Sequence, residues 1–502
     1  MRTPLPTDAA IAAHRFGLGE PDLAVVGADA SAWLRAQIGP ADAQRGANLP
    51  GLAAALACQT DARRLRTDAA QAALRAQVQA DLRARLATAA TTTRPFAERL
   101  ALFWANHFTV SLGKGSTQGL VGAFEREAIR PHIAGRFADL LAAAVSHPAM
   151  LRYLDNTQSA GPQSPVAQRL RRRGQAEAAR ADPALPPAPP RTGGLNENLA
   201  REVLELHTLG VAGGGGVYGP WGGYSQADVG ALAAVLTGWR GPRPDTAGSQ
   251  ADGMQRAAAP PAGTEAAYPF DAAWHQPGPK TVLGRAYAEG PQALRAVLDD
   301  LARHPATARH LASKLARHLV ADQPPLALVA RLAQRFTQSD GDLAAVYQAL
   351  IDSPEAWAVA ATASPPASAP TSSAAKPLPA KLKTPEEFVL SCARLLRLGD
   401  KLVARAPDAG LAALGQRPQS APSPAGWPDT ATDWLGPEAV WQRVEWASQL
   451  ADRQGAAVDA RALAAASLGP LLTAATRSQI ERAADGPQAL TLLLMAPEFQ
   501  RR

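Results

Sequence analysis

Two acidic residues three positions apart, Glu202 and Glu205, have the residue type and spacing that best fit catalysis or cation binding in this chain. At about 100° per residue on a helix, they share a face with Asn198 and Arg201. Paired carboxylates can divide general-acid and general-base roles. With the Asn198 amide they also form an oxygen-rich set that suits a hard divalent cation. The alternative is a solvated face on which Arg201 pairs with Glu205 one turn later.

Two further candidates for acid/base chemistry lie earlier in the chain. His107 ends an apolar stripe that includes Phe96, Leu100 and Phe103 at helical spacing. A neutral imidazole there could act as a general base or a metal ligand, or could be a core histidine bonded to a backbone carbonyl. Asp155 closes a predicted helix, where it could serve as a third carboxylate or shape a turn.

Basic side chains suggest places where an anion could bind. His275 and Lys280 lie in a predicted loop and would suit an anionic substrate group. His310, Lys314 and His318 are spaced by four and form one helical stripe, which could face solvent or could bind an anion or a metal. Three tryptophans could line a cleft or fill the core: Trp239, Trp274 and Trp427.

The composition predicts that helices position these side chains. Hydrophobic residues make up 46% of the 502-residue chain but aromatic residues only 5%, and Ala and Leu, which favour helix over strand, dominate the rest. We expect an all-α fold with long Pro/Gly-rich loops and at most a small β-hairpin, at residues 280–284. The main predicted helical segments are residues 52–89, 95–107, 119–145, 195–210, 225–237 and 290–359.

Low-complexity segments suggest the domain organisation. Residues 1–360 form a main helical domain that carries the candidate site, and a Pro/Ala/Ser linker follows at residues 365–379. Thr384 starts the C-terminal helical portion, residues 384–502, with Pro and two acids directly after this cap. Residues 159–194 carry an Arg cluster and a Pro/Ala run without apolar periodicity, so we expect this segment to be poorly ordered.

Charge and cysteine content exclude several classes of function. The net charge is +7, but Lys and Arg are spread along the chain among acidic residues, so we expect no nucleic-acid binding. Two cysteines cannot build a disulfide framework or a Cys-based metal site. We find no export signal and no apolar run of spanning length, which predicts a cytoplasmic protein without an integral membrane segment. Phosphate-loop, dinucleotide and nucleophile-elbow motifs are absent.

Many short motifs, taken in order, resemble a bacterial family called domain of unknown function 1800. The landmarks are His14-Arg15-Phe16-Gly17-Leu18-Gly19, Leu102-Phe103-Trp104-Ala105-Asn106-His107-Phe108, Tyr153-Leu154-Asp155-Asn156, Asn196-Glu197-Asn198 through Gly210, Leu236-Thr237-Gly238-Trp239, Trp274-His275, Lys280-Thr281-Val282-Leu283-Gly284, His304-Pro305, Lys314-Leu315 and Gly426-Trp427-Pro428. The resemblance covers almost the whole chain. It implies one all-helical unit in which the C-terminal portion packs on the main domain.

The resemblance brings no assigned reaction, so two hypotheses stay open. The first is a cation- or acid/base-assisted hydrolase or transferase acting on an envelope polymer or conjugate. Its catalytic residues would be Glu202, Glu205, His107 and Asp155, its substrate contacts Arg201, His275 and Lys280, and its divalent-cation ligands Asn198, Glu202 and Glu205. The second is a non-catalytic partner of a sulfatase-like exported family, domain of unknown function 1501, which is often co-encoded. Such a partner could carry the chain to the periplasm.

Overall fold

The computed structural model describes residues 7–178, 194–211, 223–240, 268–359 and 381–502. Within these ranges the regular structure is helical except for one two-stranded antiparallel hairpin, which confirms the predicted all-α class. The hairpin pairs β1 (Lys280–Val282) with β2 (Arg285–Tyr287), at the predicted place. None of the described helices combines the length and the apolarity needed to cross a lipid bilayer.

The helices follow one another along the chain with short connections. The first group is α1 (Thr7–Ile11), the π-helix η1 (Ala12–Phe16), η2 (Leu23–Val25), α2 (Ala30–Arg35), α3 (Leu52–Leu65), α4 (Asp68–Thr91), α5 (Pro95–His107), α6 (Val121–Phe124), η3 (Glu125–Ile129), η4 (Arg130–His132), α7 (Phe137–Ser146), α8 (Pro148–Tyr153), η5 (Asn156–Gln158) and α9 (Pro165–Ala178). The second group is α10 (Asn198–Glu202), η6 (Val203–His207), α11 (Gln226–Leu236), α12 (Gln292–Arg303), α13 (Pro305–Leu319), α14 (Leu326–Gln338), α15 (Leu343–Ile351) and α16 (Pro354–Trp357). The third group is α17 (Pro385–Leu395), η9 (Gly399–Leu402), α18 (Ala431–Trp434), α19 (Pro437–Gln454), η10 (Gly455–Ala457), α20 (Ala460–Leu468), η11 (Gly469–Leu471), α21 (Ala474–Glu481), α22 (Gly486–Met495) and α23 (Pro497–Gln500).

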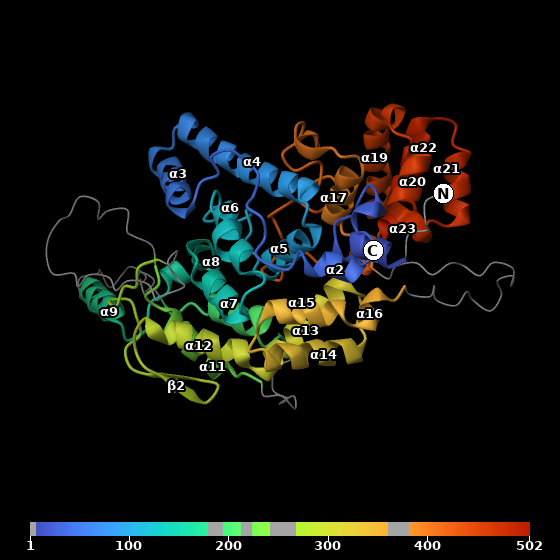
Figure 1. Cartoon of the computed structure of the whole chain (residues 1–502). Coiled ribbons are helices and arrows are strands. Elements are labelled where there is room, and N and C mark those ends of the chain that lie inside the picture. Colours follow the sequence, from blue (N-terminus) through green and yellow to red (C-terminus); the bar gives the residue numbers. More distant parts are fainter. Residues whose placement is uncertain (1–6, 179–193, 212–222, 241–267, 360–380) are drawn as a thin grey trace.

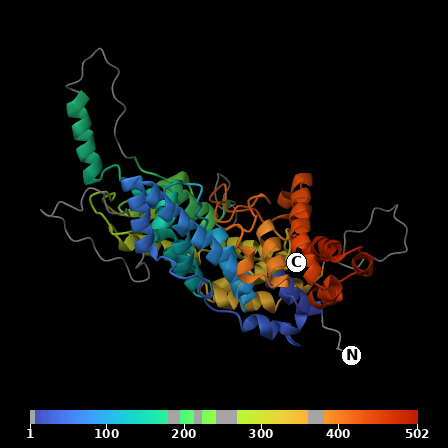
Figure 2. The same ribbon diagram turned by 90° about the horizontal axis from the view of Figure 1, so that it is seen from above.

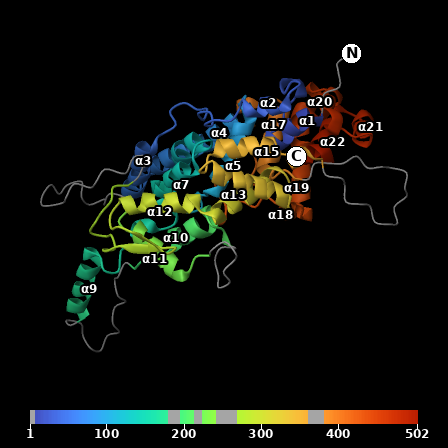
Figure 3. The same cartoon turned by 60° about the horizontal axis from the view of Figure 1, so that its bottom comes forward.

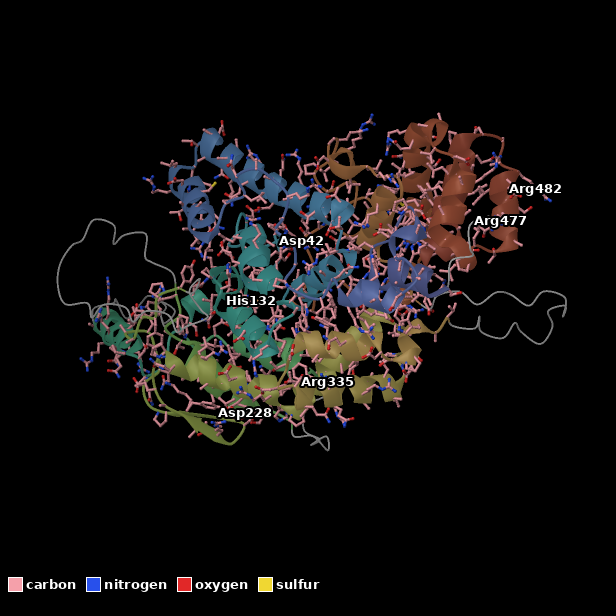
Figure 4. All side chains as sticks on the ribbon, viewed as in Figure 1. Asp42, His132, Asp228, Arg335, Arg477 and Arg482 are labelled. Carbon is pink, nitrogen blue, oxygen red and sulfur yellow. The ribbon has the colours of Figure 1, made fainter. Side chains whose placement is uncertain are left out.

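Local signals in the sequence account for several helix starts. Helices α5, α13 and α17 each begin with proline, whose missing N–H has no helical partner at that position. Ser225 with Asp228 forms the predicted capping box of α11, and Thr384 with Glu387 forms that of α17 (Asp228 is labelled in Figure 4). Asp228 also accepts the N–H of Leu283, which ties the hairpin to α11.

Predictions for two other segments were wrong. The helix predicted over residues 119–145 is broken into α6, η3, η4 and α7, because Pro131 lacks a backbone donor and interrupts regular helix. Part of residues 159–194, which we expected to be poorly ordered, forms the helix α9. Arg, Ala and Gln favour helix even without an apolar stripe. Residues 179–193 and the predicted linker 365–379 lie outside the described residues.

Helix α5 lies at the centre of the molecule, between α4 on one side and α13 and α15 on the other (Figure 1). The C-terminal helices α19–α22 gather at one end, and α9 projects from the opposite end (Figure 2). Helices α10 and α11 pack together beside α12 (Figure 3). The C-terminal end of α5 therefore lies where elements from all three groups of helices approach one another.

Buried apolar side chains form two clusters. The larger draws on residues 9–356 together with Leu471. The smaller draws on residues 388–499 and also includes Leu18, Leu86, Ala89 and Ala90 from the N-terminal part of the chain. Helix α4 contacts α17 and η9, so it links the two clusters. The region between the clusters contains the cavity described below.

Candidate functional site

Residues 195–210 contain a π-helical turn instead of the single regular helix that we predicted. Helix α10 runs directly into the π-helix η6. Gly210 has a φ of +86°, and its N–H donates to the Leu204 carbonyl at 3.2 Å. The Thr208 hydroxyl donates to the Val203 carbonyl at 2.6 Å. π-turns widen a helix and are frequent at functional sites.

Glu202 and Glu205 are half-buried on this segment. The Tyr224 hydroxyl donates to Glu205, and burial together with the nearby Glu205 charge raises the pKa of Glu202 to about 7. Burial and the Glu202 charge raise the pKa of Tyr153 to about 12, so this tyrosine lies near the pair. Arg201 donates to Glu205 at 3.4 Å and to Glu197 at 3.3 Å. The pairing of Arg201 with Glu205, left open by the sequence, is present, and the carboxyl pair is only partly solvated.

The predicted cation ligands do not gather further ligands of the usual kinds. Asn198 is exposed at the start of α10, and its N–H donates to the Asn196 side chain at 2.9 Å. Among the described residues, no group of three or more His, Cys, Asp or Glu side chains is arranged to hold a metal. Neither His107 nor Asp155 therefore completes a site with Glu202 and Glu205.

Asp155 has an ion-pair partner of its own. Its backbone is left-handed, with a φ of +59°, and its carboxylate lies 2.6 Å from the Lys114 amine. Its carbonyl accepts an N–H from Asn196 at 3.4 Å, and the Asn196 N–H donates to the Ser159 hydroxyl at 3.0 Å. These contacts are those of a turn that joins α8 to the segment before α10.

His275 and Lys280 form a separate buried pair. The Lys280 amine donates to His275 Nε2 at 2.8 Å, and His275 Nδ1–H donates to the Thr237 carbonyl at 2.8 Å. Burial lowers the pKa of both residues. Because the pair bonds to itself and to the backbone, its polar groups are already matched. Neither residue lines the cavity.

A cavity of about 440 Å³ lies between the end of α5, α13, the start of α17 and the irregular segment 415–430. It is in the usual size range of small-molecule sites. His107 lines it, as do all three members of the predicted stripe: His310, Lys314 and His318. Trp427 lines it too, whereas Trp239 is buried in the core. The cavity thus joins His107 to the basic stripe and not to Glu202.

The π-turn orients two of the histidines in the wall. His310 Nε2–H donates to the Leu206 carbonyl at 3.0 Å, and His107 Nε2–H donates to the His207 carbonyl at 3.2 Å. Both carbonyls lie at the end of η6, where a helix leaves acceptors unpaired. Donation to a carbonyl fixes the tautomer, so Nδ1 of each ring is the basic nitrogen. His107 Nδ1 is buried without a hydrogen-bond partner among the described residues.

Burial keeps these histidines neutral. It lowers the pKa of His310 to about 4 and that of His207 to about 3, and it lowers the pKa of His107 well below its ordinary value. The Lys314 charge contributes to all three shifts, which places the amine close to the three rings. The rings of His107 and His310 are 6.3 Å apart, centroid to centroid.

Lys314 and His318 differ in how they are paired. Burial lowers the pKa of Lys314 to about 8, and no described residue forms a hydrogen bond or an ion pair with its amine. His318, whose pKa burial lowers to about 4, donates Nδ1–H to Asp429 at 3.2 Å. The Nε2 atom of His318 is left buried and without a hydrogen-bond partner in the described structure.

The carboxylates around the cavity are matched by cations. Glu125 and Glu386 both pair with Arg85, and Asp429 lies 3.8 Å from the Lys381 amine. Glu387 pairs with Arg99 and, at 2.8 Å, with Arg502. Burial disfavours the Glu387 carboxylate, but the two guanidinium groups outweigh this and hold its pKa far below the usual range.

Several lining side chains have buried N–H groups without acceptors in the described structure. They are Arg99 Nη2, Gln419 Nε2 and Trp427 Nε1. Lys314 and Arg317 add two cations that no described carboxylate pairs with directly. Buried polar groups are normally hydrogen-bonded, so these donors favour a ligand that supplies oxygen acceptors.

Sequence reasoning missed Arg99, Gln419, Asp429 and Glu387 as site residues. Arg99 and Glu387 are separated by 288 positions, and they meet because α5 and α17 approach each other at the cavity. The sequence contained one local signal for this region, the capping box that includes Glu387. It contained none for the pairing of Asp429 with His318, because Asp429 lies in an irregular segment.

Comparison with known proteins identifies the family. A family model described as "Protein of unknown function (DUF1800)" matches residues 11–501. Neither the curated proteins nor the solved structures contain a match. Because the matching segment takes in both apolar clusters and the whole cavity wall, the chain belongs to the DUF1800 family along nearly its entire length.

Proposed function

We propose that this protein binds a small, oxygen-rich anion in the central cavity and catalyses an acid/base-assisted hydrolysis or transfer on it. The observation that carries the proposal is the set of unmatched donors in the cavity wall: the Lys314 amine with the buried N–H groups of Arg99, Gln419 and Trp427. Leaving such groups without acceptors is costly, and an anionic ligand would satisfy them.

Neutral histidines supply the acid/base part of the proposal. His107 Nδ1 and His318 Nε2 are basic nitrogens without hydrogen-bond partners in the described structure. Each ring is oriented by a hydrogen bond from its other nitrogen, to the His207 carbonyl or to Asp429. A base that is oriented in this way can take a proton from a bound water or hydroxyl group. We therefore assign His107 and His318 as candidate bases, and Lys314 as the group that holds the anion.

The carboxyl pair on η6 is a second candidate for acid/base chemistry. A Glu202 pKa near 7 makes this carboxyl an acid at neutral pH, beside Glu205. Two neighbouring carboxyls whose environments separate their protonation states suit general-acid and general-base roles. The carboxyl pair and the cavity give opposite variant patterns: activity lost in Glu202→Gln but kept in Lys314→Met would favour the carboxyl pair.

The alternative function, a non-catalytic helical partner, calls for a large exposed apolar face. In the described part of the chain, large exposed apolar side chains are few and mostly far apart in the sequence: Val25, Leu65, Val211, Leu326, Leu435, Val440 and Trp441. This distribution gives less support to a partner surface than the cavity gives to ligand binding.

Binding of simple oxyanions tests the proposal. Phosphate, sulfate and acetate would be titrated by calorimetry into the full chain and into Lys314→Met and Arg317→Met variants. Arg309→Met is the matched control, because Arg309 is exposed on the same helix and does not line the cavity. We expect saturable binding of at least one anion, weakened about tenfold or more in the two cavity variants, which is about 1.4 kcal/mol.

The control decides between the cavity and general surface charge. If Arg309→Met weakens binding as much as Lys314→Met does, or if no anion binds saturably, the proposal is wrong. Chromogenic phosphate, sulfate and carboxylate esters then test catalysis. A His107→Gln variant should lose turnover while its anion affinity stays within about twofold, because His107 serves as a base and not as an anion contact.

A further inference from the structure

We propose that the Lys314 amine is a nucleophile that forms an imine with the carbonyl carbon of a small anionic oxo compound in the cavity. The inference rests on the proposed function, because it assigns a covalent step to the same site. It also narrows the ligand class, from any oxygen-rich anion to one that carries an aldehyde or ketone group.

Lys314 is the lysine of the described structure whose amine is both unpaired and adjacent to a cavity. Lys114, Lys280 and Lys381 donate to carboxylate, imidazole or carbonyl groups. Lys401 is exposed. Lys383 is fully buried, with its amine 4.2 Å from the centre of the Phe499 ring, but it does not line the cavity. Unpaired and cavity-lining, Lys314 can reach a bound molecule without breaking an ion pair.

The surroundings of Lys314 favour the neutral amine that a nucleophile requires. Desolvation acts against its charge, and Arg317 on the same helix adds a like charge. Asp429 acts in the opposite sense but is already engaged by His318 and Lys381. A lysine that is desolvated and close to a second cation is an activated nucleophile. The imidazoles of His107, His207 and His310 nearby are neutral and do not compete for a negative ligand.

The covalent step balances without any oxidant or reductant. The Nζ lone pair attacks the carbonyl carbon to form a C–N bond, and the carbonyl oxygen takes up a proton to give a carbinolamine. The C–O bond then breaks, water leaves, and the remaining N–H proton passes to a base such as His107 Nδ1, the unpartnered basic nitrogen of that ring. The products are an imine and one water molecule.

Reductive trapping tests this step on the full chain. The protein would be incubated with pyruvate and cyanoborohydride, and peptide mapping by mass spectrometry would locate the reduced adducts. We expect the adduct at Lys314 to form about tenfold faster or more than at Lys383 or Lys401. Acetone, which lacks the anionic group, should label Lys314 much more slowly than pyruvate.

Two variants and one further measurement keep the outcomes separate. Lys314→Arg keeps a cation but has no primary amine, so its adduct should vanish, whereas the matched Lys383→Arg change should leave trapping at Lys314 unaltered. If pyruvate labels exposed Lys401 as fast as Lys314, the nucleophile assignment is wrong. Loss of trapping with intact phosphate binding refutes the imine alone. Loss of trapping together with all oxyanion binding in the wild-type chain refutes the proposed function as well.

Discussion

Replacing Glu387 by glutamine should strongly destabilise the protein, because it removes the carboxylate that two buried arginines share. The side chains of Glu387, Arg99 and Arg502 are 7%, 1% and 0% exposed. Among the described residues, Arg99 and Arg502 have no other carboxylate partner; each retains one backbone carbonyl, that of Gly17 or of His318. Two guanidinium groups would then stay buried without a counter-charge.

The expected loss follows from the cost of breaking a buried ion pair by removing one partner, about 3–5 kcal/mol. That is a large share of a typical folding free energy of about 5–15 kcal/mol. Glutamine is the informative substitution because it can still accept the Thr384 N–H and so preserve the capping box of α17. The change therefore isolates the charge from the helix cap.

Urea unfolding followed by circular dichroism measures the effect, with Glu386→Gln as the matched control. Glu386 is the neighbouring residue and pairs with Arg85, but Arg85 keeps a second partner in Glu125. We expect the unfolding midpoint to fall at least twice as far in Glu387→Gln as in Glu386→Gln. Equal shifts in the two variants, or no shift in Glu387→Gln, would refute the reasoning.

The same carboxylate predicts a pH dependence. The pKa of Glu387 is lowered in the folded state, so its contribution to stability is present above the unfolded value of about 4.3 and is lost as the pH falls further. The stability difference between wild type and Glu387→Gln should therefore be constant between pH 6 and 8 and should shrink progressively below about pH 4. A difference that grows on acidification would contradict the assigned direction.

Three further outcomes follow from the structure. Gly426→Ala should destabilise the cavity wall and weaken oxyanion binding, because the new Cβ would lie 2.5 Å from the Asn106 carbonyl oxygen, whereas Gly278→Ala, at a similar φ but in open space, should cost only the backbone strain of about 1–2 kcal/mol. The folded Glu202 carboxyl binds its proton up to about pH 7, so wild-type stability should fall relative to Glu202→Gln as pH rises from about 4.3 to 7, and thermal unfolding of both proteins at several pH values would reveal a difference of the opposite sign if this is wrong. Ser225→Ala removes the cap of α11 and should cost about 1 kcal/mol in urea unfolding, and no change would argue against the capping box.

Helix starts and the hairpin could be predicted from the sequence because their signals are local. Pro95 and Pro385 sit at the first positions of α5 and α17, as expected, and Ser225 caps α11. The break at Pro131 and the π-turn in η6 were not predicted. A π-turn depends on how the chain leaves the helix, here through Thr208 and Gly210, and apolar spacing averaged over a window does not register that change.

The candidate site could be predicted only in part. The sequence singled out His107 and the His310, Lys314 and His318 stripe because residue type and helical spacing are visible along one chain segment. It grouped His107 with the Glu202 face, whereas the cavity places His107 beside the basic stripe. Adjacency between helices far apart in the sequence comes from packing, which a single sequence does not encode in any local pattern.

The sequence by itself determined the fold class, the main helix starts and the family, since composition, caps and ordered motifs are properties of neighbouring residues. Only the tertiary structure decided which charges are matched. Glu387 draws in Arg99 and Arg502 from distant segments, while Lys314, with the same type of charge as any other lysine, is left unpaired at a cavity. The physical reason is that burial sets the cost of a charge and packing sets its partner, and both are defined only after the chain has folded.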